Sequence, residues 1–170
     1  AKGAVTHYVG IQDDVTEQEM TRTRLAQHAT IDSLTGLPNR TLLADRVQQS
    51  VEMAARQRSR FYVALVNIDR FKVVNDSLGH LLGDEVLRRV AERLRDAADT
   101  VDTVARFGGD VFALVISHAG SRGVDFGFDL FAEPVRVEGH EVFVTASIGV
   151  AECPAHGADA DSLIRHAEMA

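Results

Sequence analysis

The sequence contains no tryptophan, one cysteine and three prolines among its 170 residues. Because Cys153 is the only cysteine, no disulfide can form within the chain, and this fits a reducing compartment such as the cytoplasm. No apolar run approaches the roughly 20 residues that a membrane-spanning helix requires. These absences exclude a disulfide-stapled secreted domain and give no sign of a membrane segment.

Positive charge is also scarce, with 18 Lys and Arg against 25 Asp and Glu and a net charge of −7. This balance argues against a broad surface for nucleic acid or anionic membrane. A nucleotide remains compatible, because Mg²⁺ and a few local donors can neutralise its phosphates. The length and the 45% hydrophobic content predict one ordinary globular domain with a short extension.

Hydrophobic periodicity predicts an α+β fold with ferredoxin-like βαββαβ order at its centre. We expect a mostly antiparallel sheet covered by helices. The expected strands are Phe61–Ile68, 103–107, 111–117, Val135–Val137 and 142–150. The expected helices are 40–56, 80–98, 123–133 and 158–170, and residues 69–79 are expected to form a polar connection with one short helical turn.

The most informative segment is Arg106–Phe112, in which Gly108 and Gly109 separate two apolar runs. Glycine takes positive φ without steric cost, so the pair predicts a tight hairpin with Asp110 at its tip. If its strands neighbour the strand that ends at Asn67, oxygen ligands converge there. With a lysine nearby, such a site suits Mg²⁺ and a nucleoside triphosphate, although a Gly-Gly turn alone is a weak signal.

Five segments together resemble the GGDEF family, the diguanylate cyclase domains of bacterial c-di-GMP signalling. They are DSLTGLPNR (32–40), DRFKVVNDSLGH (69–80), GD (83–84), RFGGDVF (106–112) and TASIGV (145–150). The resemblance runs from about residue 29 to the end of the chain. It implies the palm fold of nucleotide cyclases and cytoplasmic signalling.

The resemblance divides the chain into three parts. Residues 1–13 look like the end of a PAS sensor domain, and residues 14–30 look like a linker helix that begins with a Thr16–Glu19 capping box. That helix is expected either to pack on the domain or to form a coiled-coil connector. Residues 31–170 form the GGDEF domain, which lacks the family's final basic segment and is therefore expected to be truncated.

In active members of the family, two GTP-loaded domains face each other as a homodimer, and each 3′-hydroxyl attacks the α-phosphate of the opposite GTP. The resemblance assigns guanine recognition to Asn75 and Asp84. Read without it, Asp84 is a solvated acid in the first turn of a helix and Lys72 is an ordinary surface lysine. The nucleotide-binding positions carried over are Phe71, Lys72, Asn75, Asp84, Gly108 and Gly109.

The metal positions match less well. Ile68 matches the residue whose carbonyl binds Mg²⁺, and Asp110 matches the first acid of the signature, a metal ligand that contributes to catalysis. Asn67 stands where the family has a metal-binding aspartate and offers only a weak neutral oxygen. Val111 replaces the second acid and cannot bind metal at all.

A third departure lies in the family's product-inhibition motif, Arg-x-x-Asp. Here Asp99 stands in the arginine position while Asp102 is retained, so feedback binding of c-di-GMP is not expected.

These departures predict a degenerate, non-catalytic regulatory domain that binds GTP with Mg²⁺ and neighbours PAS and EAL phosphodiesterase domains. Two alternatives stay open. One is an active or impaired diguanylate cyclase, a nucleotidyltransferase that converts two GTP molecules into c-di-GMP. The other is a purely structural dimerisation module.

Overall fold

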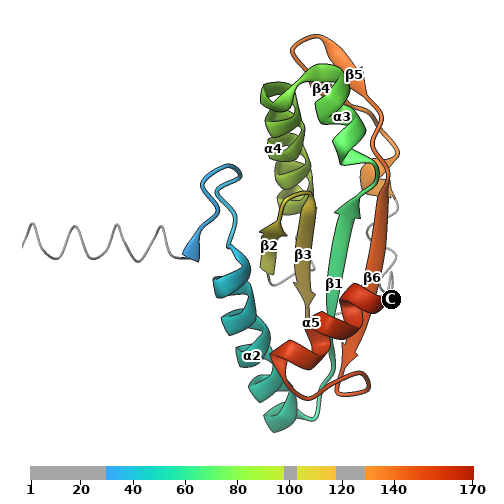
Figure 1. The fold of residues 1–170 in the computed structure, drawn as a ribbon. Helices are drawn as coiled ribbons and strands as arrows, with labels where there is room; N and C mark the ends of the chain where they lie inside the picture. The colour runs from blue at the N-terminus through green and yellow to red at the C-terminus, as the bar shows by residue number, and fades with distance from the viewer. Residues whose placement is uncertain (1–29, 98–102, 118–128) are drawn as a thin grey trace, which may run out of the picture.

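A computed structural model describes residues 30–97, 103–117 and 129–170 (Figure 1). Its centre is a four-stranded sheet in the order β2-β3-β1-β6, and each neighbouring pair is antiparallel. The strands are β1 (Phe61–Ile68), β2 (Thr103–Gly108), β3 (Val111–Ile116) and β6 (Ala146–Cys153). This order confirms the expected α+β, ferredoxin-like fold, in which β1 occupies an inner position of the sheet.

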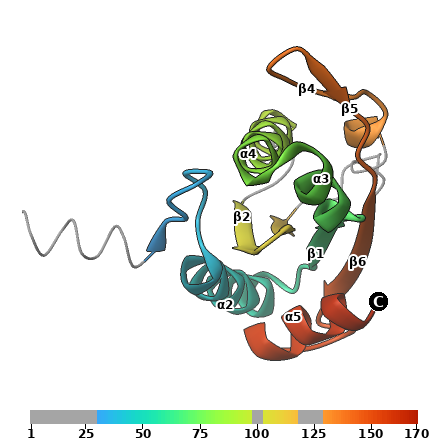
Figure 2. The ribbon, with the colours of Figure 1, turned by 45° about the horizontal axis from the view of Figure 1, so that its top comes forward.

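Helices cover both faces of the sheet (Figure 2). On one face, α2 (Arg40–Gln57) and α5 (Ala160–Met169) share a core with Phe61, Val63 and Leu65 of β1. On the other face, α3 (Phe71–Leu78) and α4 (His80–Asp96) pack on the intervening residues of β1, which include Val66 and Ile68. The alternation of β1 side chains between two cores explains its near-continuous apolar sequence.

The helix predicted for residues 40–56 is confirmed as α2. Asn39 caps its start, because the Asn39 side chain accepts hydrogen bonds from the backbone N–H groups of Thr41 and Leu42. The predicted helices at 80–98 and 158–170 correspond to α4 and α5. Within residues 30–97, 103–117 and 129–170, no helix has the length and apolar content needed to cross a membrane.

The expectation of a single helical turn within residues 69–79 was wrong. The segment contains α3, an eight-residue α-helix that buries Phe71 and packs the half-buried Val74 against the core, while Leu78 is also half-buried. These apolar residues recur at helical spacing among polar ones, so packing stabilises a helix that its short length would not. Gly79, with φ of 83°, ends α3 and joins it directly to α4.

The strand expected at 142–150 is also divided. Val142 ends β5 (His140–Val142), which pairs with β4 (Val135–Val137), and β6 begins only at Ala146. Between the two strands, Val144 turns into the core and is 3% exposed. Of the helix expected at 123–133, the described part holds the short 3-10 helix Asp129–Phe131. Residues 1–29, 98–102 and 118–128 lie outside the described residues; they include the predicted PAS remnant, all of the predicted linker helix except Thr30, and Asp99–Asp102.

Candidate functional site

The paired ends of β1 and β3 bring the predicted metal positions together. The backbone N–H of Ile68 donates to the carbonyl of Asp110 at 3.1 Å, and Asn67 lies directly opposite Val111. Because Ile68 and Asp110 are bonded to each other, Asn67 and Val111 form the adjacent non-hydrogen-bonded pair, in which side chains approach most closely. Their Cβ atoms are about 5 Å apart by the geometry of such pairs.

On the side of β1 that pairs with β6, Asp69 is hydrogen-bonded to residues at the start of β6. Its carboxylate accepts hydrogen bonds from Thr145 Oγ1 at 2.6 Å and from Ser147 Oγ at 2.7 Å. Its N–H also donates to the carbonyl of Thr145 at 2.8 Å. The hydrogen bond from Thr145, followed by the one from Ser147, lowers the pKa of Asp69 below its usual value. Asp69 is therefore an ionised carboxylate already committed to two hydroxyl donors.

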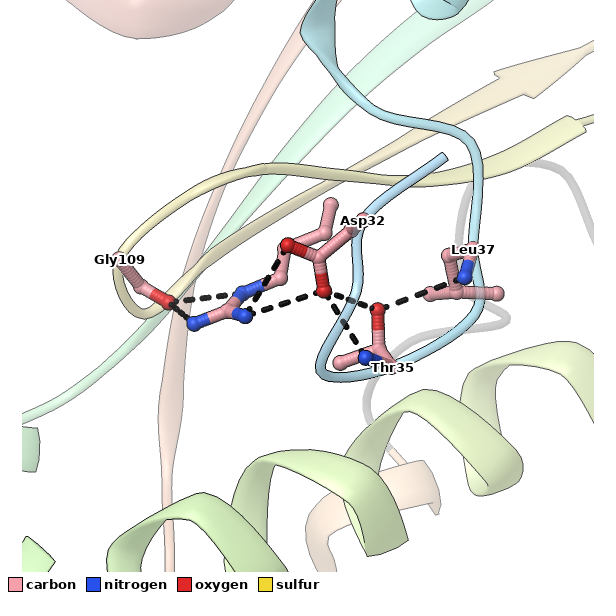
Figure 3. Close-up of polar contacts among 5 residues, drawn as sticks. Asp32, Thr35, Leu37 and Gly109 are labelled. Atoms are coloured by element: carbon pink, nitrogen blue, oxygen red, sulfur yellow. Dashed lines mark hydrogen bonds and ion pairs between the residues drawn. The ribbon is translucent and has the colours of Figure 1, made fainter. Parts of the chain in front are cut away.

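The glycine turn has the predicted backbone conformation. Gly108 and Gly109 have φ values of 150° and 57°, and both are exposed. Arg106 braces this turn, because its Nε and Nη2 atoms donate to the carbonyl of Gly109 at 3.1 and 2.7 Å (Figure 3). The same guanidinium donates through Nη1 to both carboxylate oxygens of Asp32, at 3.0 and 3.2 Å.

The loop around Asp32 is ordered by its own side chains. Thr35 donates to Asp32 Oδ1 through its N–H at 2.9 Å and through its hydroxyl at 2.7 Å (Figure 3). Burial raises the pKa of Asp32, but the hydrogen bonds from Thr35 and Arg106 outweigh burial, so the pKa lies below its usual value. From the sequence alone, Asp32 and Thr35 had no predicted role. The Asp and Thr three residues apart were a signal for such a turn.

Two further contacts fix the loop to the hairpin. The backbone N–H of Arg106 donates to the carbonyl of Pro38 at 2.8 Å. The guanidinium of Arg40 lies 4.4 Å from the ring centroid of Phe107, a cation–π contact. The loop, the start of α2 and the glycine turn therefore form one braced unit.

The predicted guanine-reading residues lie on two neighbouring helices that contact each other, Asn75 on α3 and Asp84 on α4. A Cβ atom at Gly83 would overlap Oδ1 of Asn75, so the absence of a side chain at Gly83 lets Asn75 lie against α4. Asp84 follows in α4, and both Asn75 and Asp84 are half-buried. Phe71 is 8% exposed in the core, so only its backbone can face a ligand, whereas Lys72 is exposed in the first turn of α3.

The acidic donor set at the strand ends is small. Among the described residues, no three His, Cys, Asp or Glu side chains converge to hold a metal ion. Asp110, the carbonyl of Ile68 and the amide of Asn67 are the oxygen donors that the sequence assigned to metal. Nearby positive charge comes from the exposed side chains of Arg70 and Lys72 at the start of α3.

Residues 29–170 match the family model described as "Diguanylate cyclase, GGDEF domain". Among curated relatives, the bifunctional diguanylate cyclase/cyclic di-GMP phosphodiesterase MucR of Pseudomonas aeruginosa is 41% identical over 86% of this chain and 22% of its own length. The cyclic di-GMP phosphodiesterase PdeR of Escherichia coli is 34% identical over 92% of this chain and 24% of its own. The diguanylate cyclase TpbB of P. aeruginosa is 36% identical over 86% and 35%. The chain thus spans roughly a quarter to a third of these proteins.

Solved structures agree with the sequence comparison. The GGDEF domain of TpbB from P. aeruginosa superposes with a TM-score of 0.76 at 35% identity, covering 82% of this chain and 84% of that one. A sensory box/GGDEF family protein from Caulobacter crescentus gives 0.76 at 33% identity, covering 83% and 94%. The coiled coil and GGDEF domain of C. crescentus DgcB in complex with c-di-GMP gives 0.78 at 25% identity, covering 92% and 85%.

Proposed function

Because the chain belongs to the GGDEF family of diguanylate cyclase domains, we propose that it is a regulatory domain of bacterial c-di-GMP signalling that binds GTP without converting it. The observation that carries the proposal is the pairing of Asn67 with Val111 at the ends of β1 and β3. The family resemblance gives position 67 a metal-binding aspartate and position 111 the second acid of the signature, and here the two side chains are an amide and an isopropyl group.

The donor set does not fit the metal centre that the reaction needs. Asp110 is the one carboxylate left on the hairpin side, and the Asp69 carboxylate accepts two hydroxyl hydrogen bonds instead. Mg²⁺ prefers charged oxygen ligands, and in phosphoryl transfer metal and positioning supply most of the catalysis. Loss of two acids therefore costs several kcal/mol, on the order of 10³-fold in rate or more.

The groups proposed to recognise guanine remain in place. Asp84 accepts from the N1–H and exocyclic amine of guanine, while Asn75 both donates and accepts. Gly83, the residue before Asp84, leaves room for the Asn75 side chain against α4. Lys72 supplies a positive charge for the phosphates, and the exposed turn at Gly108 and Gly109 lets the backbone approach the nucleotide.

We further propose that the domain works in the cytoplasm as a homodimer beside a PAS sensor and an EAL phosphodiesterase domain. The phosphodiesterase named in two of the relatives and the small share of their length that the chain spans support this arrangement. An impaired cyclase is the second candidate function. The backbone hydrogen bond from Ile68 to Asp110, which keeps these two residues adjacent at the strand ends, favours it.

Two measurements on the intact protein test the proposal. With Mg²⁺ and GTP, we expect no measurable c-di-GMP, and a clear rate of synthesis would replace the proposal with the cyclase. Calorimetric titration with GTP is expected to show binding that Asp84→Ala abolishes. The absence of GTP binding in the unsubstituted protein would leave the purely structural dimerisation module.

A further inference from the structure

We propose that this domain binds the triphosphate of its nucleotide without a divalent cation. The inference rests on the proposed function, since it concerns the same GTP site. The sequence led to the expectation that Mg²⁺ accompanies GTP, because relatives of this family use two acids to hold it. The side chains at the strand ends remove the need for Mg²⁺.

The first step is the register of β1 and β3. Asn67 and Val111 are opposite each other in a non-hydrogen-bonded pair, so acids at both positions would place two carboxylates side by side. The two carboxylates of such a pair repel each other, and both repel the phosphates of a nucleotide. A bound cation relieves both repulsions. An amide opposite an isopropyl group creates neither repulsion, so a polyphosphate can approach this strand end without a metal ion.

The second step concerns Asp69, the acidic residue nearest to Asn67 in the sequence. Asp69 is two residues from Asn67, but its oxygens accept from Thr145 Oγ1 and Ser147 Oγ at 2.6 and 2.7 Å. These bonds satisfy its charge locally and hold it toward β6, on the side of β1 away from Val111. Asp69 therefore links the end of β1 to the start of β6, and it does not replace the metal-binding aspartate expected at position 67.

The third step is the local supply of positive charge. Arg70 and Lys72 flank the start of α3 with exposed side chains, and among the described residues no acid forms an ion pair with either of them, although the charge of Arg70 acts on the neighbouring Asp69 carboxylate. No side chain in the described part of the chain caps the start of α3. With Asp110 as the one hairpin acid, these two cations can serve phosphate oxygens directly.

The test compares GTP affinity of the intact protein in Mg²⁺ and in EDTA by calorimetry. We expect the two dissociation constants to agree within about threefold. The variant Asn67→Asp/Val111→Glu restores both acids, and its GTP affinity is expected to fall by about tenfold or more when Mg²⁺ is removed. Val111→Gln is the matched control, because it has the size of the glutamate variant without its charge and should behave as the unsubstituted protein.

A second readout needs no nucleotide. Two facing carboxylates should lower the melting temperature of Asn67→Asp/Val111→Glu in EDTA, and Mg²⁺ should restore it. The unsubstituted protein and Val111→Gln should melt at the same temperature in both buffers.

The outcomes separate this inference from the proposed function. If GTP binding disappears in EDTA, the inference of metal-independent binding is overturned, while the proposal that the domain binds GTP is retained. GTP binding in neither buffer overturns both. An acid-restored variant that gains no dependence on Mg²⁺, in binding or in melting, also overturns the inference, because the two positions would then not control the requirement for metal.

Discussion

The guanidinium of Arg106 bridges the Asp32 carboxylate, 74 residues earlier in the chain, and the carbonyl of Gly109 in the glycine turn. The two side chains are only 13% and 23% exposed, so solvent screens this pair less than an ordinary surface ion pair. The loop before α2 therefore helps to determine where the turn lies.

We expect Asp32→Asn to weaken this brace and to lower the free energy of unfolding by about 1–2 kcal/mol, since hydrogen bonds to charged groups are among the stronger ones. Denaturant unfolding at neutral pH measures the change. Asp45→Asn on the exposed side of α2 is the control, because its amide can still accept the hydrogen bond from Gln49. Equal stability of the two variants would show that the brace contributes nothing to the fold.

The same pair gives a pH dependence. The pKa of Asp32 is lower in the folded state than in the unfolded chain, so its contribution to stability is present above the unfolded pKa of about 3.9. That contribution is lost as the pH falls through the folded pKa. Asp32→Asn should therefore lose less stability on acidification below about pH 4 than the unsubstituted protein does.

Thr145→Val tests the hydrogen bond from Thr145 to Asp69. Valine has the shape of threonine but cannot donate, so the pKa of the Asp69 carboxyl should rise toward its ordinary value. Carbon-detected NMR titration of the side-chain carboxyl measures this directly. Thr145→Ser keeps the hydroxyl and should leave the pKa low. If the pKa does not change in Thr145→Val, the hydrogen bond does not form in solution.

Some of this arrangement could be predicted from the sequence. The proximity of Asp110 to the end of β1 was predicted on the condition that the two strands are neighbours, which the sheet order confirms. The helix that Asn39 caps was predicted to within one residue. The partners of Asp69 could not be predicted, because Thr145 and Ser147 are 76 and 78 residues away and are brought there by the β1–β6 register. Sequence periodicity reports local structure and carries little information about register between distant strands.

Gly83→Ala should separate guanine recognition from stability. The added methyl group would overlap the end of the Asn75 side chain, which can rotate away at small cost, and alanine favours a helix interior over glycine by up to about 1 kcal/mol. We therefore expect the melting temperature to stay or rise while GTP affinity falls about tenfold, as in Asn75→Ala. Calorimetry on both variants checks this, and full affinity in Gly83→Ala would remove Asn75 from guanine recognition.

Restoring acids tests what the strand ends have lost. In Asn67→Asp/Val111→Glu the two carboxylates would face each other beside Asp110 and the Ile68 carbonyl, which supplies the charged oxygens that Mg²⁺ prefers. If these two positions are the main defect, c-di-GMP synthesis with Mg²⁺ should rise at least about 100-fold above the unsubstituted protein, because several kcal/mol of barrier are at stake. Turnover is measured by chromatography of the product, with each single variant as a control.

The single variants are expected to gain much less than the double variant, because each leaves one neutral side chain in the facing pair. A double variant that binds GTP and Mg²⁺ but still makes no c-di-GMP would show that the defect extends beyond the strand ends. Full activity already present in the unsubstituted protein would instead show that Asp110 and the Ile68 carbonyl suffice for the reaction, and the impaired-cyclase alternative would then be the correct one.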